Sequence, residues 1–275
     1  MSDWSVHASL DPKLENSAGK NIREALDTDE HPNSLAIAVL FDVTGSMHSV
    51  PRELIKKLPT LLGLLGMKGY VEDPQILFGA IGDATSDRVP LQIGQFESDN
   101  RLDENLGNIF LEGNGGGQNT ESYELAMYYM ARHTQLDCLD KRDHKGYLFM
   151  IGDEHPYPAV KSHEVRDVIG DDLAENISTK AIVEELKQKY EVYFIIPAGT
   201  SHYDEPELLA KWRGLLGQNA VRLPDLSAVA EYIAVTVGIA EETVTLAQAE
   251  IDLKDHGTDD STINTVRSAM SSTGA

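Results

Sequence analysis

Apolar residues gather in four short, nearly continuous runs, at residues 35–41, 75–82, 145–151 and 192–196. Runs of this length that are rich in Ile and Val indicate strands buried on both faces of a sheet. Residues 89–96 alternate apolar and polar side chains instead, which is typical of a half-buried edge strand. A last short strand is expected around Val221.

Between these runs, apolar residues recur at helical spacing. Residues 51–67 carry leucines three and four positions apart, and Pro51 suits the first turn of a helix. Pro59 is expected to kink this helix or to split it in two. Further helices are expected after the glycine cluster at residues 113–117, and at residues 180–190, 205–216 and 226–238. Strands that alternate with helices in this order predict an α/β fold in which helices cover both faces of a parallel sheet.

Three parts of the chain differ in apolar density. Residues 1–34 are polar, so we expect an N-terminal arm with at most a loose helical segment at residues 21–26. Residues 35–240 contain all the predicted strands and should form one domain. Residues 241–275 are poorer in apolar side chains and end in Ser, Thr and Gly, which predicts a weakly structured C-terminal extension, either a frayed helix or disordered.

The net charge of the chain limits the classes of partner that it is expected to bind. Its 275 residues include 23 Lys and Arg against 45 Asp and Glu, so the formal net charge is −22. A chain this acidic repels phosphate, and we therefore expect neither nucleic acid nor an anionic membrane as a partner. The charge can serve solubility alone, or it can reflect an affinity for divalent cations or basic partners.

Cysteine content and hydropathy bear on location. Cys138 is the only cysteine, so no disulfide can form within the chain, and without a motif around it Cys138 is expected to be a structural thiol. The N-terminus has no apolar signal core, and the longest apolar runs are too short to span a bilayer. These features predict a soluble, cytoplasmic protein.

Three of the predicted strands are followed directly by aspartates, at Asp42, Asp83 and Asp153. Because the carboxyl ends of parallel strands meet at one edge of a sheet, these side chains should share an oxygen-rich pocket with Thr44 and Ser46. A single Asp after a strand is more often a helix cap than a ligand. Three of them beside an Asp-x-Thr-x-Ser sequence favour a site for a hard cation such as Mg²⁺ or Mn²⁺.

The sequence Asp42-x-Thr44-x-Ser46 resembles the metal-ion-dependent adhesion site (MIDAS) of von Willebrand factor A (vWA) domains, and the resemblance extends over residues 35–237. Residues 115–121 resemble the Gly-Gly-Gly-Asp-x-Pro-Glu loop of one branch of that family, in which the glutamate contacts the metal. A threonine does so in the other branch, so Thr120 and Glu121 are both candidates. Residues 152–156 resemble the strand end that carries the family's last aspartate.

This resemblance implies a Rossmann-like, doubly wound, mostly parallel sheet flanked by helices. It also implies a bound Mg²⁺, or Mn²⁺ or Ca²⁺, with an open position that accepts an Asp or Glu of a partner protein. Bacterial members of the family often act as adaptors for MoxR-type AAA+ ATPases, which makes such an ATPase one class of partner. The implied metal donors are Asp42, Thr44, Ser46, Thr120 or Glu121, and Asp153, with Asp83 in the surrounding shell.

Two alternatives remain beside a non-enzymatic, metal-dependent protein-binding module. A haloacid-dehalogenase-type phosphatase also places an Asp after its first strand, but its Asp-x-Asp pattern has Thr44 at the second position here. Losing that acid/base group removes a factor of about 10²–10⁴ in rate, so we expect no enzyme. The other alternative is a scaffold whose metal site is structural or empty.

Overall fold

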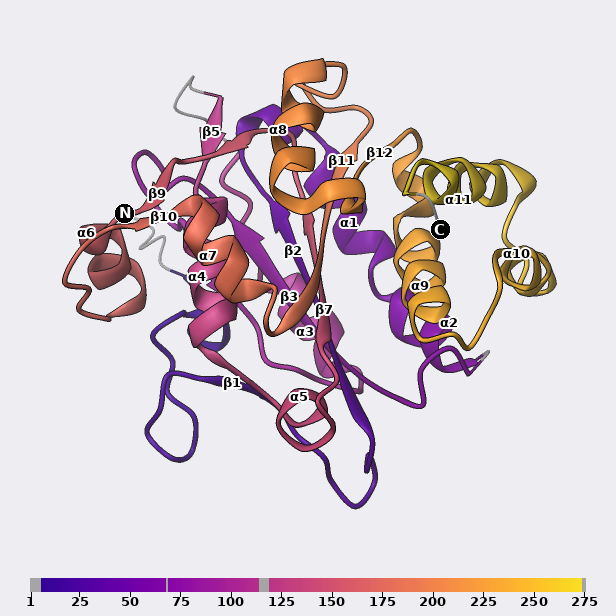
Figure 1. Cartoon of the computed structure of the whole chain (residues 1–275), viewed down its shortest axis with the longest axis horizontal. Coiled ribbons are helices and arrows are strands. Elements are labelled where there is room, and N and C mark those ends of the chain that lie inside the picture. Colours follow the sequence, from indigo (N-terminus) through magenta and orange to yellow (C-terminus); the bar gives the residue numbers. More distant parts are fainter. Residues whose placement is uncertain (1–5, 68, 114–118, 274–275) are drawn as a thin grey trace.

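The computed structural model describes residues 6–67, 69–113 and 119–273. Its centre is a mixed six-stranded sheet in the order β12-β11-β7-β2-β3-β4, in which only β4 runs antiparallel to its neighbour (Figure 1). The strands of this sheet are β2 (Ser34–Asp42), β3 (Asp73–Ile81), β4 (Leu91–Ile93), β7 (Gly146–Ile151), β11 (Tyr190–Pro197) and β12 (Ala220–Leu223). The strands predicted from apolar runs are confirmed, and the predicted edge strand is β4.

The burial of the central strands explains why the apolar runs predicted them. Every residue of β2, β3 and β7 is buried, because each of these strands has a neighbour on both sides and helices cover both faces. Strand β3 also needs Gly79 at its middle, since a Cβ there would lie 2.5 Å from the Leu40 side chain and 2.6 Å from the Gln92 carbonyl oxygen. Strand β3 therefore packs closely against both of its neighbours, β2 and β4.

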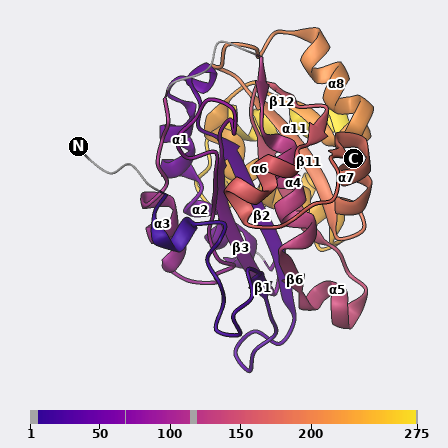
Figure 2. The ribbon, with the colours of Figure 1, turned by 90° about the vertical axis from the view of Figure 1, so that its left-hand side faces the viewer.

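Helices flank the sheet on its two faces, and the fold is α/β (Figures 1 and 2). Helices α4 and α7 lie on one side in Figure 1, and α1, α2 and α9 lie on the other. The predicted break at Pro59 is confirmed, because α1 ends at Lys57 and α2 begins at Thr60. The helices of the domain are α1 (Val50–Lys57), α2 (Thr60–Met67), α3 (Arg101–Gly107), α4 (Tyr123–Arg132), α5 (Asp137–Arg142), α6 (Ser162–Glu164), α7 (Thr179–Leu186), α8 (Pro206–Leu216) and α9 (Val229–Ala240).

Short elements complete the description. Three two-stranded sheets pair β1 (Arg23–Ala25) with β6 (Thr134–Leu136), β5 (Thr120–Glu121) with β8 (His155–Pro156), and β9 (Ala159–Val160) with β10 (Ile177–Ser178). The remaining helical turns are η1 (Ala8–Leu10), η2 (Gly45–Met47), η3 (Val165–Ile169), η4 (Gly217–Asn219) and η5 (Leu226–Ala228).

The N-terminal arm is more ordered than its polarity suggested. The helical segment predicted at residues 21–26 is wrong, because Arg23–Ala25 forms strand β1 along β6. Arg23 is fully buried, and its guanidinium donates to the carbonyls of Asp11, Leu14, Ile93 and Gly94. These hydrogen bonds hold the arm against the end of β4, a contact that no local pattern in the sequence reveals.

The predicted weakly structured extension at residues 241–275 is also wrong. The chain there forms α10 (Leu246–Asp255) and α11 (Asp260–Thr273). Both helices bury one stripe of sparse apolar side chains, which includes Leu253, Ile263 and Val266. A few such residues at helical spacing suffice when a neighbouring surface receives them, and low apolar density alone was therefore misleading. Among the described residues, no helix combines the length and the apolar character that crossing a lipid bilayer requires.

Candidate metal centre

The order of the strands marks one place at the edge of the sheet. From β2 the chain builds outward through β3 and β4 on one side, and through β7, β11 and β12 on the other. Ligands of open α/β sheets bind outside the carboxyl ends of the strands at the point where this order reverses. Here that point lies between β2, which ends at Asp42, and β7, which ends two residues before Asp153.

A chain of hydrogen bonds joins these two strand ends. Asp42 Oδ1 accepts from the Thr44 backbone N–H at 2.8 Å and from the Thr44 hydroxyl at 2.6 Å. The Thr44 and Ser46 hydroxyl oxygens are 3.4 Å apart, and Ser46 Oγ donates to Asp153 Oδ1 at 2.7 Å. The turn η2 directs both hydroxyls to the same side while Met47 is buried beneath it. Four of the predicted donors therefore lie together.

Tyr123 supports the site from below, a role that the sequence did not reveal. Its hydroxyl donates to Asp42 Oδ2 at 2.8 Å, and its buried ring packs edge-on against Phe194 and Trp212. Gly152 leaves room for this ring, because a Cβ there would lie 1.9 Å from the tyrosine oxygen. Burial raises the pKa of the Asp42 carboxyl, although the hydrogen bonds from Thr44 and Tyr123 act in the opposite direction.

Glu121 and Glu154 bring two more carboxylates to the same place. The side chains are 3% and 4% exposed, and Oε2 of each has no hydrogen-bond partner among the described residues. Burial, followed by the charges of Asp42 and Glu154, raises the pKa of Glu121. Burial also raises the pKa of Glu154, whose carboxyl interacts with both Glu121 and Ser46. The sequence prediction named Glu121 and missed Glu154, although Glu154 directly follows the predicted ligand Asp153.

Thr120 and Glu121 point in different directions. They form the short strand β5, and successive side chains of a strand face opposite sides. Glu121 interacts with the carboxyls of Asp42 and Glu154, whereas Thr120 interacts with the hydroxyl of Tyr157. The geometry favours Glu121 as the donor. The glycine cluster before it was part of the same prediction, and residues 114–118 lie outside the described residues.

Asp83 lies in a hydrogen-bonded turn of its own. Its carboxylate accepts from the backbone N–H and hydroxyl of Thr85, from the Ser86 hydroxyl and from the Tyr157 hydroxyl. Burial acts to raise its pKa, but these hydrogen bonds outweigh burial and hold the pKa below its usual value. Tyr157 interacts with both Asp83 and Thr120, so this turn adjoins the site through one tyrosine.

A third loop closes the site on the side of α8. The backbone N–H of His202 donates to Asp153 Oδ2 at 3.0 Å, and Ser201 N–H donates to the Ser46 carbonyl at 3.0 Å. The His202 ring lies 2.6 Å from Glu205 Oε1 and 3.8 Å from Glu154 Oε1. Ser201 also contacts the ring of His48, 3.0 Å away. Asp153 is therefore held from two loops at once, which leaves little freedom in its carboxylate.

The donor set fits a hard divalent cation. The carboxylates of Asp42, Glu121, Asp153 and Glu154 are all buried, and no lysine or arginine among the described residues forms an ion pair with any of them. Two of these carboxyl oxygens lack partners among the described residues, and a buried carboxylate in that position is costly unless a proton or a cation neutralises it. Within the described ranges, no three His, Cys, Asp or Glu side chains are arranged so that they alone could hold a metal ion. The candidate site instead combines carboxylates with the Thr44 and Ser46 hydroxyls.

Comparisons with known proteins bear on the fold. No family model matches the chain, and no curated protein matches it. The pilus adhesin SpaC of Lactobacillus rhamnosus GG, in an open conformation, matches with a TM-score of 0.54 and 10% identity over 75% of this chain and 30% of the adhesin. A second SpaC structure matches with a TM-score of 0.55 and 11% identity, over 75% of this chain and 31% of the adhesin. Proximal thread matrix protein 1 from the mussel byssus matches with a TM-score of 0.50 and 8% identity, over 75% of this chain and 48% of the byssus protein.

These likenesses show a shared fold. The chain spans about a third of the length of SpaC and about half that of the byssus protein. Identities this low leave the site residues to be judged on their own geometry.

Proposed function

We propose that this protein is a vWA-type module that binds a partner protein through a divalent cation. The observation that carries the proposal is the hydrogen-bonded set of Asp42, Thr44, Ser46 and Asp153 at the point where the strand order reverses. The order of the strands and the helices on both faces support the finer description of the domain as a Rossmann-like, doubly wound sheet.

Asp42, Thr44, Ser46, Glu121 and Asp153 would hold the cation, which we expect to be Mg²⁺, or Mn²⁺ or Ca²⁺. All of them offer hard oxygen donors. When bound, the cation supplies a Lewis-acidic position that can take a carboxylate from outside. This explains how a chain with a net charge of −22 can receive an acidic partner, because a divalent ion inverts the local charge.

The partner is expected to present an Asp or Glu side chain at a protruding position. A MoxR-type AAA+ ATPase remains one class of partner, on the strength of the sequence resemblance alone. The structural neighbours are named as an adhesin and a thread matrix protein, and these names agree better with a binding module than with an enzyme.

Calorimetric titration with Mg²⁺ and with Mn²⁺ tests the metal site. Wild type should bind close to one ion per chain, and Asp42→Ala should not bind. Asp143→Asn is the matched control, because Asp143 is exposed and caps α5 in a left-handed conformation that Asn tolerates. Saturable binding that persists unchanged in Asp42→Ala would contradict the proposal.

A second measurement separates binding from hydrolysis. The Oδ1 atom of Asp42 already accepts two hydrogen bonds from Thr44, and Thr44 occupies the position of the phosphatase's second aspartate. We therefore expect no hydrolysis of p-nitrophenyl phosphate in the presence of Mg²⁺. Hydrolysis by wild type that disappears in Asp42→Asn would establish the phosphatase alternative in place of the binding module.

A further inference from the structure

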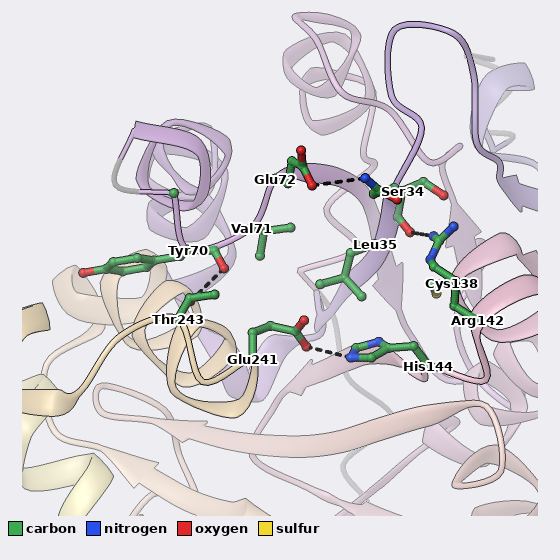
Figure 3. Close-up of a pocket in the computed structure, with 12 residues that line it drawn as sticks. Ser34, Leu35, Tyr70, Val71, Glu72, Cys138, Arg142, His144, Glu241 and Thr243 are labelled. Carbon is green, nitrogen blue, oxygen red and sulfur yellow. Dashed lines mark hydrogen bonds and ion pairs between the residues drawn. The ribbon is translucent and has the colours of Figure 1, made fainter.

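A cavity of about 360 Å³ lies at the amino edge of the sheet, opposite the candidate metal centre. It opens between the start of β2, the turn that precedes β3, the segment before β7 and the end of α9 (Figure 3). Its volume is within the range of sites that hold small organic molecules. Neither the metal donors nor the loops around them contribute to its lining.

The inner wall of the cavity is apolar. Leu35 and Val71, each 6% exposed, and Cys138, 1% exposed, form part of this wall. Polar side chains stand around the opening in Figure 3, among them Glu72, Glu241 and His144. An apolar interior with a few convergent polar groups is typical of sites that bind a small organic ligand.

The charges around the opening select the ligand. The Arg142 guanidinium is already engaged, because it donates to Asp27 Oδ2 at 2.8 Å and to the Ser34 carbonyl at 2.6 Å. The His144 ring lies 3.2 Å from Glu241 Oε1, the same oxygen that accepts from the Tyr147 hydroxyl. The guanidinium and the imidazole of the lining therefore have partners of their own.

The two glutamates retain capacity for a cation. All hydrogen bonds to Glu241 described above use Oε1, which leaves Oε2 for a ligand. Glu72 accepts from the Asn33 amide at 3.1 Å, and neither Glu72 nor Glu241 forms an ion pair with a lysine or arginine in the described part of the chain. An anionic ligand would meet two carboxylates, and a neutral one would cover them without offsetting their charge.

We propose that this cavity binds a small organic cation with an aliphatic body, of the alkylamine or guanidine type. Its charged nitrogen would lie against Glu241, with Glu72 as the second carboxylate, and its aliphatic part would pack on Leu35 and Val71. The proposal is independent of the metal centre, since the two sites lie at opposite edges of the sheet.

Calorimetric titration of the full chain with agmatine and with cadaverine tests this site. We expect saturable binding of one molecule per chain, with pentane-1,5-diol and glutarate showing none. Glu241→Gln should weaken binding at least about tenfold, the usual scale for losing a charge-assisted contact, while its amide oxygen still accepts from Tyr147. Val71→Phe should abolish binding by filling the cavity. Glu242→Gln is the matched control, because Glu242 is the exposed neighbour outside the lining.

Two results would overturn the proposal. The first is the absence of saturable amine binding to wild type at millimolar concentrations. The second is binding that is equal in wild type, Glu241→Gln and Val71→Phe, which would show diffuse attraction to a chain of net charge −22. If Val71→Phe does not fold, as judged by thermal unfolding, the comparison of Glu241→Gln with Glu242→Gln and of cadaverine with its diol decides the question alone.

Discussion

Two pairs of aspartates, one at each edge of the central sheet, have different kinds of partner. At the amino edge Asp27 lies 2.8 Å from Arg142 and 3.2 Å from Lys141, and Asp137 lies 2.7 Å from the same lysine. At the carboxyl edge, the donors that Asp42 and Asp153 have among the described residues are hydroxyls and backbone amides. Asp27 and Asp137 therefore form ion pairs with side chains of the chain itself, whereas within the described ranges Asp42 and Asp153 form none.

The carboxyl pKa values at the two edges differ accordingly. The hydrogen bond from Arg142 holds the pKa of Asp27 well below its usual range. Burial and the neighbouring carboxylates raise the pKa of Glu121 instead. At the carboxyl edge the carboxyls face one another instead, so burial and mutual repulsion favour their protonated forms. A divalent cation would displace these protons and stabilise the carboxylates, and this is the physical content of the proposed metal centre.

Exchanging Glu121 tests the carboxyl edge most severely. Glu121→Gln keeps the size of the side chain but removes a charge that faces Asp42, and it should weaken Mg²⁺ binding by about 100-fold, the upper end for groups that support a metal site. Thr120→Val, on the opposite side of the same strand, should leave the affinity unchanged. Calorimetry on both variants measures the difference. A larger loss in Thr120→Val would move the donor to Thr120 and contradict the assignment made from β5.

Much of the fold could be predicted because its determinants are local. The apolar run before Asp42 becomes β2, and Pro59 separates α1 from α2 as expected. Strand β1 escaped prediction because three polar-flanked residues become a strand only when β6 lies beside them. Helices α10 and α11 escaped it because their few apolar residues are stable only against the surface that covers them.

The candidate site divides in the same manner. Asp42, Thr44 and Ser46 are readable together because a single turn carries all of them. The contact of Tyr123 with Asp42 joins residues 81 positions apart, and no spacing rule announces it. Glu154 was overlooked because an acid next to a predicted ligand reads as a surface charge until its burial is known.

Replacing Arg142 tests the pairing of Asp27 at the amino edge of the sheet. Arg142→Met leaves Asp27 with Lys141 alone and takes the donor from the Ser34 carbonyl, so the free energy of unfolding should fall by about 2 kcal/mol, as for other hydrogen bonds to charged groups. Asp27 has a folded-state pKa below its unfolded value, so its contribution is complete above the unfolded pKa and is lost as the pH falls through the folded pKa.

The stability difference between wild type and Arg142→Met should therefore be largest near neutral pH and shrink in acid, which urea unfolding at several pH values would show. Lys145→Met is the matched control, because Lys145 pairs with Glu191 where both side chains are well exposed, and such pairs contribute little. Equal losses in the two variants would mean that the pairing of Asp27 with Arg142 contributes no more than an exposed surface pair.

Glu154→Gln should have the smallest effect on Mg²⁺ affinity, and it tests directly whether Glu154 is a metal donor. Glu154 interacts with Ser46 and Glu121, but it is not one of the five proposed donors. Replacing it should weaken Mg²⁺ binding only about threefold, below the range for groups that orient metal ligands, because a neighbouring carboxylate is lost and no donor is removed. Glu207→Gln, on the exposed first turn of α8, controls for the loss of surface charge. A loss as large as that of Glu121→Gln would instead make Glu154 a donor itself, and the carboxyl edge would then hold its cation without a position left for a partner.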